Sequence, residues 1–458
     1  AAAIITGAVP PPPQVPLPLP DRLGGGVLML TDEQLRALQA ISGSIEVESR
    51  KGLLQAAKKG MAVAEATSGP EIRLDYSRVR QGPPVGFDVP FDGDLVRVEV
   101  IPSEFERLGI SARKPIWDSG RKRLAKYLAK RDRESARQGL IATSGRAALN
   151  AQESAYNVLR AQELEHVAVV SLTQLAEHLR VAEERYASGL VAYLDVITAE
   201  ADLAQAQREL IAAGVQVELA KLELKKLLRI ELDRDITVEP GKELKVPDMS
   251  VEDMIRRAVG DVEGVEPRAD IRAAEEAAKK ARAEALAPLV NNGLSLDLIA
   301  AFDRQTATGL AAGDHWQYGF AISKPLYDAG LARRQRKMLQ EMYEVARLEV
   351  DRVAWEAARQ VAAAYALVQA ADKEVEATRR RQLSADESLR VWRLKYENGF
   401  AVGSDVLDAQ AELTRANAAL VDARYERQLR VVRLRTAMGD WRALIRPGAV
   451  ATGGGTHR

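Results

Sequence analysis

Two stretches that lie 210 residues apart decide the fold of this chain: Lys114-Pro115-Ile116-Trp117-Asp118-Ser119-Gly120 and Lys324-Pro325-Leu326-Tyr327-Asp328-Ala329-Gly330. The same offset relates Tyr186 to Tyr396 and Gly189 to Gly399, and no gap is needed from Lys114 to Leu224. A helix tolerates changes of residue but not of length, because one inserted residue rotates its apolar face. The register therefore predicts an internal two-fold repeat of rigid helices.

Long stretches without proline follow both motifs. They run from Gly120 to Ser188 and from Gly330 to Asn398, a length that corresponds to about 100 Å of α-helix. In the segment that follows the first of them, apolar residues recur every seven positions, as in the seam of a coiled coil: Leu203, Leu210, Val217 and Leu224. We therefore predict a long helix and an antiparallel return helix in each repeat, bundled lengthwise.

A strand pair precedes each long helix, at about 71–114 and about 293–326. In the second pair, large apolar residues alternate with small or polar ones from Leu294 to Phe302 and from Trp316 to Ile322, which is the pattern of a strand with two unlike faces. The first pair is longer by a segment rich in Gly, Pro and Asp at 82–94, where we expect an irregular loop.

Four strands per chain cannot close a β-barrel. If their apolar faces meet lipid, several chains must share one barrel, because unpaired strand edges are not tolerated there. Two chains would supply eight strands and three would supply twelve. A rival interpretation packs two soluble hairpins on the helices. The aromatic side chains favour the membrane and resemble an aromatic belt: Trp316, Tyr318, Phe320 and Phe302.

The chain divides at changes of composition. Residues 1–30 are rich in proline and predict a disordered arm, 31–240 and 241–440 hold the two repeats, and 441–458 form a tail. Each repeat is expected to contain a helix, the β-hairpin, the long helix and the return helix. No signal peptide is visible, and the chain begins at Ala1 without Met, so a processed start is expected.

Composition excludes several functions. The formal net charge is +0, which leaves no general argument for a nucleic-acid partner. There are no cysteines, and the four histidines have no metal-ligand spacing. No nucleophile motif or phosphate loop is present, so we expect no enzyme, no cofactor and no metal site. No apolar run reaches the length of a membrane-spanning helix.

The motifs resemble those of the outer-membrane factor family, the TolC-like channels. The likeness covers about 70–440 and rests on Gly189-Leu190-Val191-Ala192-Tyr193-Leu194-Asp195-Val196, on Ser404-Asp405-Val406-Leu407-Asp408-Ala409-Gln410, and on the Lys324–Gly330 motif. It implies a mainly α fold with a long α-helical barrel and a twelve-stranded β-barrel completed in a homotrimer. It also implies a passive duct for multidrug or metal efflux or type I protein secretion, set in outer-membrane lipid and reaching through the Gram-negative periplasm.

The resemblance also implies site residues and partners. Gly189 and Gly399 would form the turns of the periplasmic tip, where the duct meets an adaptor protein and an inner-membrane transporter. Asp195 and Tyr396 would help to hold the tip closed, and Asp405 with Asp408 would form its narrowest ring. The chain has Ala401 where TolC has an arginine of the closing network.

Each site residue also has a purely structural interpretation. Asp195 and Asp405 suit the capping of helix starts, Tyr396 suits seam packing, and the two glycines suit positive φ at helix ends. The alternative to a channel is a soluble coiled-coil scaffold, or a periplasmic adaptor with no pore.

Overall fold

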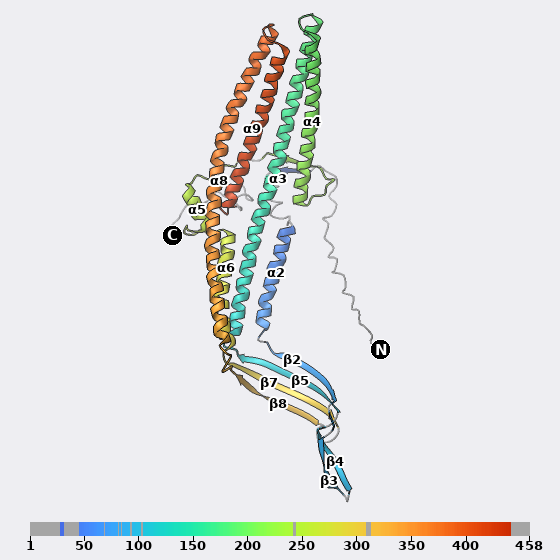
Figure 1. Ribbon diagram of the computed structural model, residues 1–458, viewed down its shortest axis with the longest axis vertical. Helices are drawn as coiled ribbons and strands as arrows, with labels where there is room; N and C mark the ends of the chain where they lie inside the picture. The colour runs from blue at the N-terminus through green and yellow to red at the C-terminus, as the bar shows by residue number, and fades with distance from the viewer. Residues whose placement is uncertain are drawn as a thin grey trace, which may run out of the picture.

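The structure is a computed structural model that describes residues 28–31, 45–67, 69–80, 82–83, 85–91, 94–101, 104–240, 244–307 and 313–440. The chain is elongated, with a bundle of helices at one end and a curved β-sheet at the other (Figure 1). The predicted tail, 441–458, lies outside the described residues.

Two long helices of equal length run through the helical part. They are α3 (Arg121–Ala187) and α8 (Leu331–Glu397), each of 67 residues. Each turns back at its far end into a return helix, α4 (Tyr193–Leu228) or α9 (Gly403–Ala437). The equal lengths confirm the gapless repeat. No helix in the described ranges is long and apolar enough to cross a membrane.

The repeated motif acts as the start signal of both long helices. Gly120 and Gly330 have φ of 92° and 74°, a left-handed conformation that glycine adopts without strain. The Asp118 carboxylate accepts hydrogen bonds from the backbone N–H of Gly120 (3.0 Å) and Lys122 (2.8 Å). Asp328 binds the equivalent N–H groups of the second repeat at 2.9 Å. The aspartates therefore satisfy donors that a helix start leaves free.

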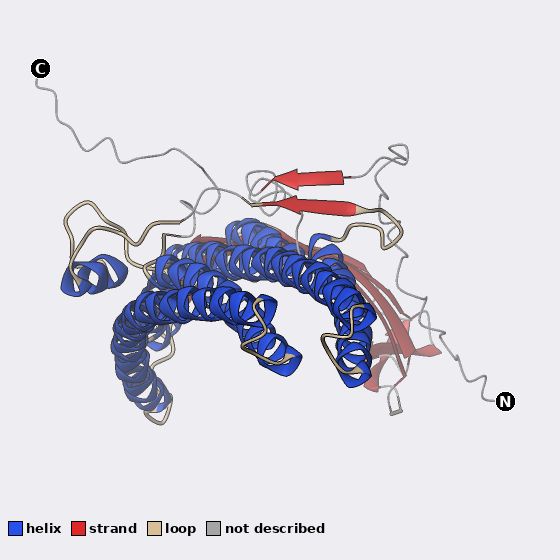
Figure 2. Ribbon diagram, turned by 90° about the horizontal axis from the view of Figure 1, so that it is seen from above, coloured by secondary structure: helices blue, strands red, loops and turns tan. Residues whose placement is uncertain are grey.

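The helices form one curved layer. Shorter helices, α2 (Ile45–Ala66) and α6 (Ala269–Glu284), continue the lines of α4 and α9 toward the sheet (Figure 1). Across the layer, α3 packs against α4 and α2 on one side and against α9 and α6 on the other, and α8 packs outside α9 and α6. Seen along the helices, the layer is an arc (Figure 2). Its outermost members are therefore α4 with α2 and α8.

Several short strands and helices lie beside this arc. The strands β1 (Leu28–Thr31) and β6 (Ile236–Glu239) pair in parallel and lie on its convex side (Figure 2). The helix α5 (Val251–Val259) packs on α8, and α7 (Ala287–Asn291) precedes the second strand pair. Ser250 caps α5 by accepting a hydrogen bond from Asp253 N at 3.1 Å.

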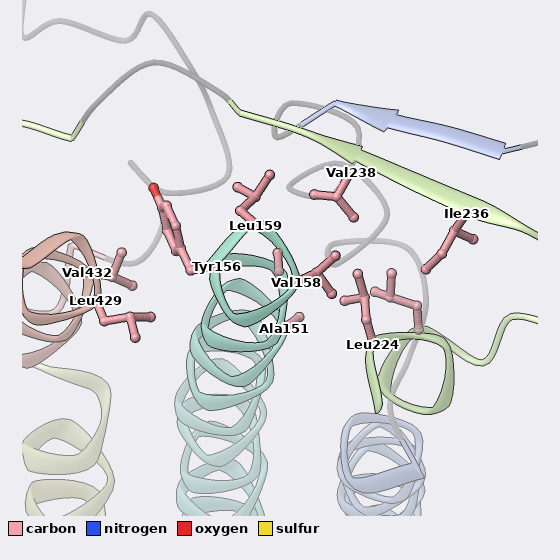
Figure 3. Packing of buried hydrophobic residues seen from close by; sticks show 11 residues of the cluster. Ala151, Tyr156, Val158, Leu159, Leu224, Ile236, Val238, Leu429 and Val432 are labelled. Carbon is pink, nitrogen blue, oxygen red and sulfur yellow. The ribbon is translucent and has the colours of Figure 1, made fainter. Parts of the chain in front are cut away.

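The hydrophobic core lies between the helices near the middle of the arc. Val158 of α3, Leu224 of α4 and Ile236 of β6 are fully buried in one cluster (Figure 3). The same cluster includes the alanines Ala151 and Ala155, which let helix backbones approach closely. The seam predicted from Val217 and Leu224 is thus a packing surface.

The sheet has the strand order β2-β5-β7-β8, all antiparallel: β2 (Glu71–Arg80), β5 (Glu104–Trp117), β7 (Ser295–Ala307) and β8 (Gly313–Ser323). The register places most of the large apolar side chains of the four strands on one face, exposed to the surroundings: Ile72, Leu74, Tyr76, Leu108, Ile110, Leu298, Phe302, Trp316, Tyr318, Phe320 and Ile322. The opposite face is polar, and there Arg113 pairs with the buried Asp297 at 2.5 Å. A sheet with two such faces separates an apolar medium from a wet interior.

Two sequence predictions are wrong in this part of the chain. The segment expected to be an irregular loop forms a second antiparallel hairpin, β3 (Val85–Phe91) and β4 (Asp94–Ile101), beyond the far end of the sheet (Figure 1). The alternating apolar residues in 85–91 are a sequence pattern that indicates a strand. Residues 28–30, assigned to the arm, belong to β1, because a partner distant in the sequence, β6, pairs with them. The rest of the arm lies outside the described residues.

Candidate functional site at the helical tip

The two tip turns are built alike. Gly189 and Gly399 have φ of 71° and 78°, and each donates its N–H to a carbonyl three residues earlier, at 2.9 and 3.0 Å. The next residue in each turn donates to a carbonyl five residues earlier, which completes a helix-ending motif. The prediction that these glycines permit positive φ is confirmed.

Tyr396 is the buried centre of the tip. Only 4% of it is exposed, and it packs in a cluster with Leu389 and Val406. From the first repeat, the guanidinium of Arg185 lies 4.5 Å from the centre of its ring and donates a hydrogen bond to its backbone carbonyl. The His178 ring lies 5.6 Å away, centre to centre. The phenol hydroxyl has no hydrogen-bond partner among the described residues, so Tyr396 joins the two helical hairpins through its ring and backbone.

Asp195 and Asp405 occupy the first turns of α4 and α9. The Asp405 carboxylate accepts a hydrogen bond from Val402 N at 3.2 Å, so its capping interpretation is confirmed. Asp195 faces the other hairpin, because a Cβ added to Gly403 would lie 3.8 Å from its carboxylate. The start of α9 can approach α4 this closely because residue 403 has no side chain.

The remaining charges of the tip are partly buried. Burial lowers the pKa of His178, and the Arg393 cation lowers it further, while Asp202 and Asp195 oppose the shift. Burial raises the pKa of Asp202, against the effect of His178 and with a contribution from Asp408. Asp408 itself is exposed. Acidic and basic groups of both hairpins are therefore close enough to shift one another's pKa values.

The pKa of Tyr396 is also shifted by burial and by charged groups of the other hairpin. Burial raises the pKa of its phenol, the Arg185 cation lowers it, and the Asp195 carboxylate raises it. Asp195 and Tyr396, which the family resemblance assigns to the closed tip, thus lie close enough to interact through charge. They interact through charge, because the Asp195 carboxylate contributes to the raised pKa of the Tyr396 phenol.

A buried polar network ties the two hairpins together below the turns. Gln410 of α9 is only 4% exposed. Its carbonyl oxygen accepts a hydrogen bond from Arg393 of α8 at 2.9 Å, and its amide nitrogen donates to Gln174 of α3. Thr414 extends the network to Ser171 of α3 at 3.1 Å. Polar groups buried this way are costly to separate.

Tyr396 provides a test of how the tip is held. We expect Tyr396→Phe to leave the conductance of the channel unchanged, because the packed ring and the hydrogen bond from Arg185 to the backbone carbonyl of residue 396 both remain. Tyr396→Ala removes the packed ring and should destabilise the tip by about 3–5 kcal/mol, which raises basal conductance. Single-channel recordings of both variants measure this difference. An open channel in Tyr396→Phe would contradict the packing account.

Sequence reasoning did not identify Arg185, His178, Arg393 or Gln410 as site residues. One signal was available for Arg185, because it and Lys395 are matched cations of the repeat at the ends of helices. Gln410 lies in the motif that the sequence analysis quotes, but nothing in the sequence shows its burial. No group of three or more acidic or histidine side chains in the described ranges is arranged to hold a metal ion.

The four aromatic residues of the predicted belt share the apolar face of the sheet. Trp316, Tyr318 and Phe320 are 71%, 76% and 69% exposed, and Phe302 lies opposite Trp316 in the register. The rings of Trp316 and Tyr318 stack with centres 5.8 Å apart. Trp316, Tyr318 and Phe320 follow one another along β8 at successive levels, and Phe302 of β7 shares the level of Trp316.

The comparisons with known proteins agree with this geometry. A family model described as outer membrane efflux protein matches residues 39–228 and 265–440. The chain belongs to this family. Members of the family are passive channels of the outer membrane, not enzymes. A search of curated protein sequences found no match.

Solved structures share the fold of this family member. The channel protein CusC has a TM-score of 0.72 at 18% identity, covering 89% of this chain and 92% of that one. The outer membrane protein VceC of Vibrio cholerae has 0.70 at 21%, covering 89% and 96%. The MtrE channel of Neisseria gonorrhoeae, solved in an open state, has 0.63 at 19%, covering 89% and 88%. The predicted fold class is confirmed: each chain brings four antiparallel strands, and the barrel of this fold closes in a trimer.

Proposed function

We propose that three copies of this chain form a passive exit duct of the Gram-negative outer membrane. The observation that carries the proposal is a sheet with one polar and one apolar face and two unpaired edges, β2 and β8. An open apolar edge of this length is a liability in water and is not tolerated in lipid. Pairing β8 of one copy with β2 of the next, three times, removes every edge and gives twelve strands.

The helical layer supports the same closure. Its two outermost members expose apolar stripes at helical spacing, Ile211, Val215 and Leu219 on α4 and Met338, Met342 and Val345 on α8. Exposed apolar surface at both flanks of an arc fits contact between neighbouring copies. Because β2 lies on the side of α2 and α4 and β8 on the side of α8, strands and helices close in the same direction.

The tip is the proposed gate and the proposed contact with an adaptor protein and an inner-membrane transporter. Family membership supports these partners, and the bridged hairpins support a closed resting state. The duct would carry small toxic molecules or metal ions driven by that transporter, with no energy conversion in this chain. In this arrangement Asp195 and Tyr396 stabilise the closed tip, and the aromatic residues of β8 contact lipid.

The direct test uses the full chain purified from membranes. We expect a trimer that resists dissociation on an unheated gel and that forms ion channels of low basal conductance in planar bilayers. A monomer in the soluble fraction would overturn the proposal and favour the scaffold without a pore.

Asp405 and Asp408 provide a finer test of the gate. Three copies would bring six carboxylates around one axis, and close like charges attract cations. We expect Asp408→Ala, whose side chain is exposed and caps no helix, to reduce cation selectivity and block by trivalent cations. Asp405→Ala should also cost about 1 kcal/mol of helix stability. Unchanged selectivity in the double variant would remove both residues from the constriction.

A further inference from the structure

Exposed cations that form no ion pair with a described carboxylate gather at the start of both long helices. Residues 121–131 of α3 hold six basic and no acidic residues, and residues 331–340 of α8 hold four basic and none acidic. Seven of these side chains form no ion pair with a described carboxylate and are exposed: Arg121, Lys122, Arg123, Lys130, Arg333, Arg334 and Lys337. Elsewhere on α8, exposed arginines pair with glutamates one turn away, as Arg352 and Arg390 do. We call the seven side chains the basic collar.

The collar opposes the usual chemistry of a helix start. The N-terminal end of a helix carries a partial positive charge and favours acidic residues in its first turn. Neither α3 nor α8 has one there, and the nearby carboxylates of Asp118 and Asp328 are already engaged with backbone N–H groups. A local rule broken in the same way in both repeats points to an external anion that compensates the charge.

Both halves of the collar lie at one level of the molecule. The register sets Trp117 and Ile322 on either side of Leu296, so β5 and β8 end together. The two following turns are fixed to the same segment: Ser119 donates to the Leu294 carbonyl at 2.7 Å, and Asn292 donates to Asp328 at 2.6 Å. The first turns of α3 and α8 therefore form a band where the sheet meets the helices, and Lys130 and Lys337 lie further along the same helices.

Exposed amphipathic side chains join this band to the apolar face. A register shift between Pro115 and Trp117 brings Trp117 level with the apolar residue Leu296. In the second repeat, Leu326 and Tyr327 are 93% and 89% exposed. At the end of this apolar surface, tryptophan and tyrosine lie beside lysine and arginine. This arrangement fits the boundary between hydrocarbon and phospholipid headgroups.

We propose that the basic collar binds the headgroups of anionic phospholipids in the leaflet on the helical side of the membrane. The proposal rests on the proposed function, because it needs the apolar face in lipid. Headgroup phosphates supply the negative charge that the first turns of α3 and α8 lack, and Trp117 and Tyr327 lie at the boundary with the acyl chains. The bound lipid fixes the depth of the sheet in the membrane.

The test compares lipid binding by the purified trimer and by Arg121→Gln/Lys122→Gln/Arg123→Gln, a variant that keeps good helix formers. Phosphatidylglycerol and phosphatidylcholine are titrated into detergent, with bound lipid counted by native mass spectrometry. One cation near an anionic surface changes affinity by about fivefold. We therefore expect the triple variant to bind phosphatidylglycerol at least about tenfold more weakly, and phosphatidylcholine equally. In 1 M salt the unmodified protein should lose the same preference.

The matched control is Lys373→Gln/Arg379→Gln/Arg424→Gln, which removes the same charge from exposed positions far from the sheet. Arg333→Gln/Arg334→Gln/Lys337→Gln repeats the test on α8 if the first variant does not assemble. If the collar and control variants bind lipid equally, with trimer and channel activity intact, lipid binding by the collar is contradicted and the proposed channel function is not. Altered ion selectivity with unchanged lipid binding would place these cations in the channel lumen and also overturn it. A chain that forms no membrane trimer would overturn the duct itself.

Discussion

Phe320→Arg should abolish assembly of the trimer in the outer membrane. Phe320 is 69% exposed on the apolar face of β8, and its register partner Leu298 lies on the same face. An arginine on the lipid face of a membrane β-barrel costs about 2–4 kcal/mol near the middle of the bilayer. Three symmetric copies would raise this cost to about 6–12 kcal/mol, which is comparable to the whole stability of a typical folded domain, about 5–15 kcal/mol. Membrane fractionation and an unheated gel measure the trimer.

The control for this change lies three residues away on the same strand. Gln317 points to the polar face, because successive residues of a strand alternate between faces. Gln317→Arg adds the same side chain at a neighbouring level and should leave the trimer intact. Equal loss of trimer in both variants would mean that strand pairing, and not the medium around the apolar face, had been disturbed. Normal assembly of Phe320→Arg would contradict contact of this face with lipid.

Gln410→Ala should open the tip. The change leaves the Arg393 guanidinium without an acceptor and the Gln174 amide without a donor, in a site where Gln410 is 4% exposed. Each buried polar group that loses its partner costs about 1–3 kcal/mol, so the closed arrangement should lose about 2–6 kcal/mol. Even 2 kcal/mol changes an equilibrium about thirtyfold. Basal conductance of single channels should therefore rise by at least about tenfold.

The internal repeat supplies a matched control for Gln410. The residue 210 positions earlier is Glu200, at the same place in α4, and it is exposed. Glu200→Ala removes a side chain of the same length from the equivalent helix turn without breaking a described contact, so the channel should stay closed. If both variants have the same conductance, the polar network does not keep the tip closed, and packing around Tyr396 remains as the interaction that does.

The repeat is symmetric in sequence but not in its contacts. Asp195 and Asp405 are matched by the offset, yet Asp405 caps its own helix while Asp195 faces Gly403 of the other hairpin. Tyr186 and Tyr396 are matched as well, yet Tyr186 is 46% exposed and contacts the Tyr193 ring at a tilt of 43°, whereas Tyr396 is buried between hairpins. Identical local motifs thus acquire different roles because each copy has a different neighbour.

The sequence alone determined the long helices, their turns and the four strands of the sheet. Helix length, the aspartate and glycine signals at helix starts and turns, and the alternation of Trp316 to Ile322 are local properties, fixed by backbone geometry and side-chain periodicity. Resemblance to a known family added the positions of the gate. The contacts between elements could not be obtained in this way. The Gln410 network, the Arg185 contact with Tyr396 and the pairing of β1 with β6 join residues that lie far apart in the chain. Only the packed helices decide which polar side chain is buried and which partner satisfies it, because burial depends on the neighbours and not on the residue itself.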